Sequence, residues 1–259
     1  MGLKGLNLDF FNECVYKETG YKVLGSFLFG SQNYGLNTED SDVDVITVVS
    51  PSLEYIVTHK DFITEKFDKK DGGKVLVYDI RKYVDLLLKM DANALECYYT
   101  PYAKLSSSWD ESFKFFMEDN YLHTNLLFYK PKVFANSTLG RAKSYLLQAE
   151  KARLRDNKEV FCKKIAMGQY FLDVLDKYYS NDFQDYCDLI KGAKDILDIK
   201  TGKSYFSKPF DYYDWEAMFK TQLSISAFET DVSYKEQPAI RDIIIDYTEQ
   251  ILQSYFITI

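Results

Sequence analysis

The stretch FGSQNYGLNTEDSDVDVITVV, residues 29–49, places a Gly-Ser pair and three alternating acids directly before an apolar run. The acids are Asp40, Asp42 and Asp44, and residues 43–49, which are β-branched apart from Asp44, are typical of a buried strand. Carboxylates at such a position repel each other and resist desolvation, so the pattern requires a compensating group. A divalent metal ion is the first candidate.

The spacing of the last two acids predicts how they are presented. In a strand, residues two apart point to one face, so Asp42 and Asp44 would lie side by side with Cα atoms about 7 Å apart. Such a pair suits Mg²⁺, and two ions about 4 Å apart can clamp the attacking and leaving oxygens of a phosphoryl displacement. Gly30 lets the backbone approach a phosphate, and Ser31 adds a hydroxyl. The stretch therefore predicts a site for phosphate and metal.

Two other binding motifs, a calcium loop and a P-loop, are excluded because required residues are missing. A calcium loop beginning at Asp40 would need Gly and Glu where the chain has Val45 and Pro51. A P-loop beginning at Gly25 would need Lys where the chain has Ser31. A solvated acidic loop after a glycine turn remains the alternative without a function. Gly-Ser combined with two alternating acids favours function over it.

Composition narrows the class of protein. The 259 residues are 46% hydrophobic and carry a net charge of −7, which argues against coating nucleic acid through bulk electrostatics. A basic segment at residues 141–164 still leaves a local groove open. The four cysteines lie far apart, so we expect reduced thiols rather than zinc ligands. With no signal peptide and no apolar run of membrane-spanning length, we expect a cytoplasmic protein without a membrane partner.

Periodicity changes along the chain. Strands are predicted at residues 21–29, 43–49 and 74–80, with helices at residues 7–17, within 53–67 and from residue 80. After residue 101 strand patterns fade, and helices are predicted at residues 113–117, 139–152, 160–179, 183–197, 215–223 and 240–256. The pattern predicts a small α/β domain followed by a helical domain.

The opening stretch resembles the signature of the DNA polymerase beta-like nucleotidyltransferase superfamily: an apolar residue, Gly30-Ser31, ten residues, then Asp42-Val43-Asp44 in an apolar strand. YDIRKYVDLLLKMDANALECYY, residues 78–99, resembles the next block of predicted bacterial and phage members, which usually carries Asn-Pro where this chain has Asn-Ala. The detailed resemblance spans residues 23–101. It implies an α+β fold, with a mixed-sheet, polymerase beta-like palm domain at residues 1–105 and a helical domain at residues 106–259.

The resemblance also implies a reaction. A nucleoside monophosphate would pass from a nucleoside triphosphate, with ATP favoured, to an acceptor hydroxyl, and pyrophosphate would leave. Asp42 and Asp44 would bind two Mg²⁺ ions, with Mn²⁺ as the alternative, and Gly30 and Ser31 would hold the β- and γ-phosphates. The acceptor is open among RNA or tRNA, a protein and a small molecule such as an aminoglycoside. A catalytically inactive, antitoxin-like nucleotide-binding partner protein is the alternative of another class.

Two further roles follow from the resemblance. A third carboxylate is implied on an adjacent strand, and Asp79 is the first candidate, with helix capping as its structural alternative. Glu96 is the runner-up, with a surface position as its alternative. A cation from the helical domain is also implied, and Lys163 or Lys164, which open KKIAMGQYFLDVL, would contact the triphosphate. The charges at residues 151–158 are more typical of a solvated face.

Overall fold

The computed structural model describes residues 7–38, 41–58, 61–68, 73–106, 111–180, 182–192, 194–202 and 239–256. Contacts divide the chain into two compact units, each discontinuous in sequence. The first unit holds Met1–Asn33, Asp40–Tyr129 and Gln237–Ile259, and the second holds Tyr34–Glu39 and Lys130–Glu236.

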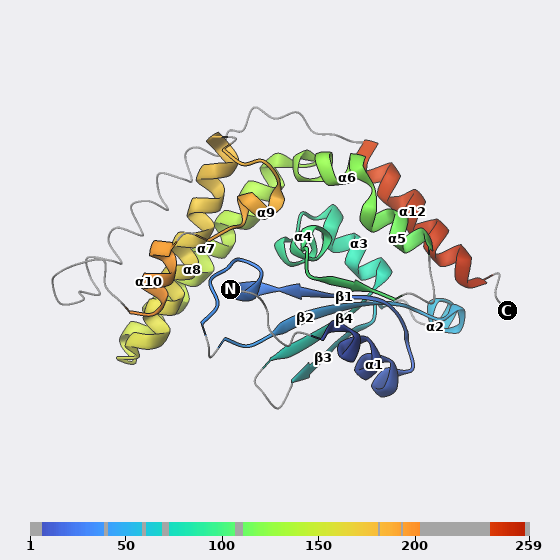
Figure 1. Ribbon diagram of the computed structural model, residues 1–259, viewed down its shortest axis with the longest axis horizontal. Coiled ribbons are helices and arrows are strands. Elements are labelled where there is room, and N and C mark those ends of the chain that lie inside the picture. Colours follow the sequence, from blue (N-terminus) through green and yellow to red (C-terminus); the bar gives the residue numbers. More distant parts are fainter. Residues whose placement is uncertain are drawn as a thin grey trace. The chain divides into compact units, whose positions relative to one another are not determined.

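The first unit is built on a mixed five-stranded sheet with the order β3-β4-β2-β1-β5 (Figure 1). The strands are β1 (Lys22–Phe29), β2 (Asp44–Ser50), β3 (Thr64–Asp68), β4 (Lys74–Asp79) and β5 (Ala103–Leu105). β2 and β4 run parallel, and every other neighbouring pair is antiparallel. The predicted α+β class with a mixed sheet is confirmed. β2 begins at Asp44, one residue after the predicted start at residue 43. Asp42 precedes the strand, so the side-by-side geometry expected for Asp42 and Asp44 in a strand does not apply.

Helices cover both faces of this sheet (Figure 1). The helical elements described in the first unit are α1 (Leu8–Thr19), η1 (Gly30–Gln32), α2 (Leu53–Thr58), α3 (Ile80–Leu88), α4 (Ala92–Tyr99), α5 (Glu111–Glu118), α6 (Asn120–Asn125), η2 (Leu126–Phe128) and α12 (Ala239–Phe256). Asn7 caps the start of α1, and Gly20 ends it at φ 72°, a left-handed conformation that glycine adopts without strain.

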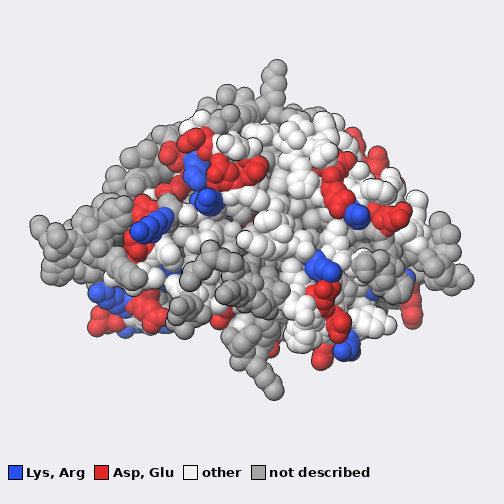
Figure 2. Space-filling model, in the orientation of Figure 1, with Lys and Arg blue, Asp and Glu red and all other residues white. Residues whose placement is uncertain are grey.

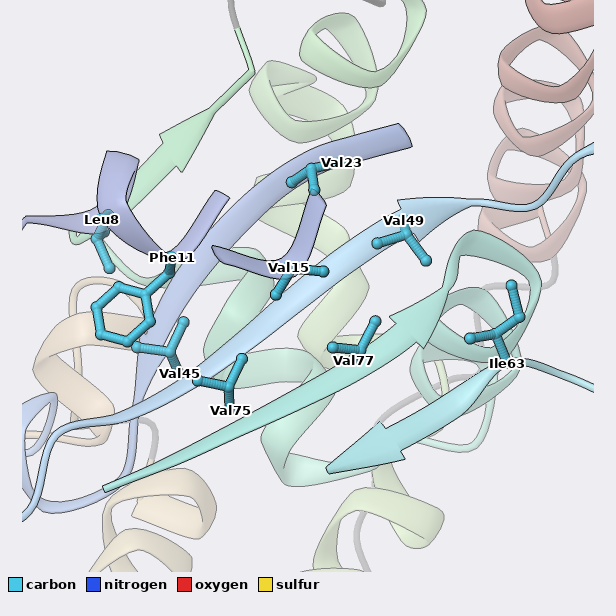
Figure 3. Packing of buried hydrophobic residues seen from close by; sticks show 9 residues of the cluster. All are labelled: Leu8, Phe11, Val15, Val23, Val45, Val49, Ile63, Val75 and Val77. Carbon is cyan, nitrogen blue, oxygen red and sulfur yellow. The ribbon is translucent and has the colours of Figure 1, made fainter. Parts of the chain in front are cut away.

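The packing of α1 shows which way the strand residues face. Leu8, Phe11 and Val15 of α1 form a buried cluster with Val23, Val45, Val49, Ile63, Val75 and Val77 (Figure 3). Side chains alternate between the two faces of a strand. Asp44, Ile46 and Val48 of β2 therefore point to the opposite face, on which α3 and α4 lie.

The described helices of the second unit are α7 (Pro131–Leu154), α8 (Lys158–Ser180), α9 (Tyr186–Leu189) and α10 (Lys194–Lys200). α7 and α8 are joined by residues 155–157 and pack against each other. The helix predicted at residues 183–197 is two short helices, α9 and α10. The helix predicted at residues 215–223 lies outside the described residues.

The structure also describes the cysteines, the apolar character of the helices and the grouping of the elements. The four cysteines, which all lie within the described residues, form no disulfide with one another: Cys14, Cys97, Cys162 and Cys187. No helix in the described ranges is long and apolar enough to cross a membrane. The division between residues 105 and 106 stays a prediction, although the contact units place α5, α6 and α12, which follow it, with the sheet.

Candidate functional site

The Gly-Ser turn lies at the end of β1, beside the start of β2. Gly30 begins η1 with φ 80°, a conformation that favours glycine. Phe29 pairs with Asp44 in the antiparallel β1–β2 register. A Cβ atom added at Gly30 would lie 3.7 Å from Asp44 Oδ2. Sequence and register therefore bring Gly30 and Asp44 together, as the motif predicts.

The two motif acids have different surroundings. Asp44 is partly buried, and its Oδ1 accepts a 3.1 Å hydrogen bond from the Lys74 backbone N–H. Asp42 is exposed and precedes the strand. Within the described residues, neither the Asp42 carboxylate nor the Ser31 hydroxyl makes a hydrogen bond or ion pair. Both groups can therefore accept a ligand without first breaking a described interaction.

Glu96 reaches the same turn from α4. Its side chain is only 1% exposed, so the surface position considered for it is wrong. Glu96 Oε2 accepts a 2.9 Å hydrogen bond from the Gly30 backbone N–H. Asp91 caps the start of α4 by accepting from the N–H groups of Asn93 and Ala94, which fixes the helix that carries Glu96. Because the Gly30 N–H already donates to Glu96, a phosphate would have to accept hydrogen bonds from other donors of the turn.

Asp79 is not brought to this turn. In the parallel register it lies opposite Val49, five residues beyond Asp44, or about 16 Å along the strand at about 3.3 Å per residue. Asp79 also shares the face of Val75 and Val77, which pack against α1, whereas Asp44 points to the other face. The residues of β4 on the face of Asp44 are Lys74, Leu76 and Tyr78, and none is acidic.

The contacts of Asp79 explain its burial. Its carboxylate accepts from the backbone N–H groups of Lys82 and Ile63, each at 2.9 Å, and pairs with Arg81 at 2.7 Å. The first of these bonds caps α3. The structure thus gives Asp79 the capping role named as its alternative, and it brings Glu96, the runner-up, to the Gly30 turn. The role of either residue as the third carboxylate stays a prediction.

The two residues after Ser31 add polar groups that the sequence analysis did not single out. Gln32 Nε2 donates to the Ser41 carbonyl at 3.3 Å, and Asn33 Oδ1 accepts from Thr100 Oγ1 at 2.9 Å. Gln32 Oε1 and Asn33 Nδ2 are buried and have no partner within the described part of the chain. A buried polar atom without a partner costs about 1–3 kcal/mol, so we expect a water molecule or a ligand to bond to both atoms. Their only sequence signal is their place directly after Gly-Ser.

Asp42 and Asp44 fit a magnesium site that is completed by oxygens of the substrate. Among the described side chains, no three His, Cys, Asp or Glu residues are gathered closely enough to hold a metal ion by themselves. Mg²⁺ commonly keeps several waters and uses one or two protein carboxylates together with substrate phosphates. Asp42 and Asp44 match that donor set, with a nucleotide supplying further oxygens.

Lys163 and Lys164 both lie on α8 in the second unit. Lys163 is exposed, and Lys164 Nζ lies 5.2 Å from the centroid of the Tyr145 ring. A cation over an aromatic face gains modest stabilisation, so Lys164 has a structural role of its own. Their contact with a triphosphate stays a prediction.

Comparisons with known proteins show the family to which the sequence is similar. The sequence model described as "RlaP: RNA repair pathway DNA polymerase beta family" matches residues 11–163, which include the Gly30 turn, Asp42, Asp44 and Glu96. A crystal structure of a nucleotidyltransferase-like protein from Exiguobacterium sibiricum 255-15 is similar at a TM-score of 0.31 and 7% identity, over 95% of this chain and 78% of that chain. A structural similarity of this size supports no argument about function. The comparison with curated proteins found no match.

Proposed function

The chain belongs to the RNA repair pathway DNA polymerase beta family, RlaP, and we propose that it moves a nucleoside monophosphate from a nucleoside triphosphate to an acceptor hydroxyl, releasing pyrophosphate. The superfamily resemblance of the sequence is thereby confirmed. The observation that carries the proposal is the convergence of Gly30, Asp44 and Glu96, because the turn, the strand acid and a second carboxylate meet where the motif predicts a nucleotide.

Each residue of the candidate site has a role in this proposal. Ser31 Oγ and Asn33 Nδ2 donate to the triphosphate, because neither donor is used by the described residues. Asp42 and Asp44 hold Mg²⁺, which when bound neutralises charge on the phosphoryl oxygens. Glu96 fixes Gly30 and adds a buried negative charge beside the Gly-Ser turn. Catalysis then depends on positioning and charge rather than on a covalent enzyme intermediate.

We propose an RNA hydroxyl as the acceptor, because the matched family is described by an RNA repair pathway. The net charge of −7 argues that the acceptor is bound through local contacts. In Figure 2 the acidic and basic side chains of the described residues are interspersed on the face in view. A protein or small-molecule acceptor is an alternative outcome of the test below.

Pyrophosphate release tests the proposal. The full chain is incubated with Mg²⁺, each nucleoside triphosphate in turn, and RNA, tRNA, a protein or an aminoglycoside. We expect release with ATP and RNA, and none when EDTA removes the metal. Asp44→Asn is the matched control, because it keeps the shape and an acceptor for the Lys74 N–H but removes the charge. Nucleotide binding without release from any combination would favour the inactive partner protein instead.

A further inference from the structure

The spacer between Ser31 and Asp42 belongs to both units of the molecule. Its ends lie in the first unit, where Gln32 Nε2 donates to the Ser41 carbonyl. Its middle, Tyr34–Glu39, is grouped with the helical second unit. The chain thus runs from the Gly-Ser turn through the second unit and back to the motif acids.

Tyr34 fastens the spacer to α8. Its side chain is 4% exposed, and its ring centroid lies 4.5 Å from that of Tyr170. Tyr170 is itself fixed, because its hydroxyl donates to the Ile190 carbonyl at 2.8 Å. The Tyr34 carbonyl accepts a 2.9 Å bond from the Gly192 N–H, so ring and backbone are held by the same part of the second unit.

Leu36 makes the second attachment. Its side chain is fully buried, and its carbonyl accepts a hydrogen bond from Lys200 Nζ at the end of α10. A Cβ atom at Gly192 would lie 2.5 Å from Leu36 Cγ and Cδ2, so only glycine permits this approach. Gly35, between the two attached residues, has φ 71°, which glycine tolerates. Two buried side chains and two hydrogen bonds are more than a solvated spacer needs.

We propose that Tyr34 and Leu36 are positioning residues, through which the second unit holds the spacer and sets the geometry of Ser31 and Asp42 for the nucleotide. The inference rests on the proposed function. Binding of the nucleotide and metal at Ser31 and Asp42 then favours the state in which residues 34–39 are attached to the second unit. This attached state in turn favours nucleotide binding, because linkage between two equilibria is reciprocal. A spacer that only fills the core of the second unit would lack this coupling.

Hydrogen exchange of residues 186–202, which contain Gly192 and Lys200, measures the coupling in the full chain. The probe is Mg²⁺ with an ATP analogue whose α- and β-phosphates are joined by a methylene group, so that no turnover occurs. We expect the probe to slow exchange in this segment by about fivefold or more in the wild type. Calorimetry on the same samples reports whether the probe binds.

Gly192→Ala pushes Leu36 out of place without changing any residue of the turn. We expect the slowing to shrink to under about twofold and kcat/KM to fall about tenfold or more. Leu36→Ala removes the attachment without adding atoms, and we expect the same direction of change if Gly192→Ala does not fold. Gly140→Ala in α7 is the control, because an added Cβ there meets nothing within 4 Å, and it should behave as the wild type.

The outcomes separate the two proposals. If the probe binds the wild type and exchange of residues 186–202 is unchanged, the coupling is overturned and the proposed function stands. Full kcat/KM in a folded Leu36→Ala variant also overturns it. If the probe does not bind the wild type at concentrations up to about 1 mM, the proposed function fails and the inference fails with it.

Discussion

Asp79 was expected to be a metal ligand, but in the structure its carboxylate caps α3 and pairs with Arg81. We predict that Asp79→Asn lowers the free energy of unfolding by about 2 kcal/mol, because Asn keeps the cap of α3 but loses the ion pair with Arg81, which is 18% exposed. Turnover should stay within about threefold of the wild type. Urea denaturation and steady-state kinetics on the same preparation check both values. A loss of activity as large as that of Asp44→Asn would return Asp79 to the site.

Glu96 has two roles in this account, because it accepts the Gly30 N–H and it carries a negative charge. A single substitution separates them. Glu96→Gln keeps an oxygen that accepts the Gly30 N–H but removes the negative charge. We predict that kcat falls about a hundredfold, or about 3 kcal/mol of barrier, while circular dichroism stays that of the wild type. Unchanged kcat would limit Glu96 to holding the turn.

Among the elements, those with strong local patterns were predictable from the sequence. The apolar runs of β1, β2 and β4 and the helical spacing of α3 identified these elements to within a few residues. β3 and β5 were not predicted, because both are short edge strands and the sequence TEKFD of β3 alternates without a continuous apolar run. Local patterns reveal such strands poorly.

The register between elements decided the site and could not be predicted. Asp79 ends an apolar strand, as the superfamily resemblance implies for a third carboxylate, yet the parallel pairing of β4 with β2 places it opposite Val49. Glu96 was only the runner-up, because its bond to Gly30 joins residues 66 positions apart. That Gly30 lies beside Asp44 was predictable, because both belong to one motif of 15 residues, 30–44. The roles of Gly30, Ser31, Asp42 and Asp44 stay predictions.

α8 carries a carboxylate, Asp173, whose pKa is raised by burial. Burial raises the pKa of Asp173 from 3.8 to about 6, and nearby Asp195 and Asp176 add to the shift, against a 2.7 Å bond from Gln169 Nε2. Because the folded pKa lies above the unfolded one, the favourable contribution is complete below pH 3.8 and is lost as pH rises through about 6.

Asp173→Asn should therefore stabilise the protein near neutral pH by about 1 kcal/mol, a value reduced for the partial exposure of the side chain. Asn keeps an oxygen that accepts from Gln169, so the local contact is retained. Thermal denaturation from about pH 4 to pH 8 checks this, with the gain expected to vanish at the acidic end. A gain of equal size at every pH would contradict the assignment.

For the whole molecule, the sequence predicted a sheet domain and a helical domain but not how the chain is shared between them. Residues after 236 return to the first unit, and the spacer at residues 34–39 joins the second. Such groupings depend on contacts between distant segments, which leave no local pattern. We expect the proposed activity to require both units, because residues 34–39, which connect Ser31 to Asp42, belong to the second unit.

The central claim is that this chain transfers a nucleotide through Asp42 and Asp44, and the fate of two labelled phosphates tests it most directly. The full protein receives Mg²⁺, an RNA with a free 3′-hydroxyl, and ATP labelled either at the α- or at the γ-phosphate. The account predicts that the α-label enters the RNA and the γ-label leaves as pyrophosphate. Asp44→Asn should reduce both by at least about a thousandfold, or about 4 kcal/mol of barrier. Transfer of the γ-label to the RNA, or full transfer by Asp44→Asn, would contradict the account.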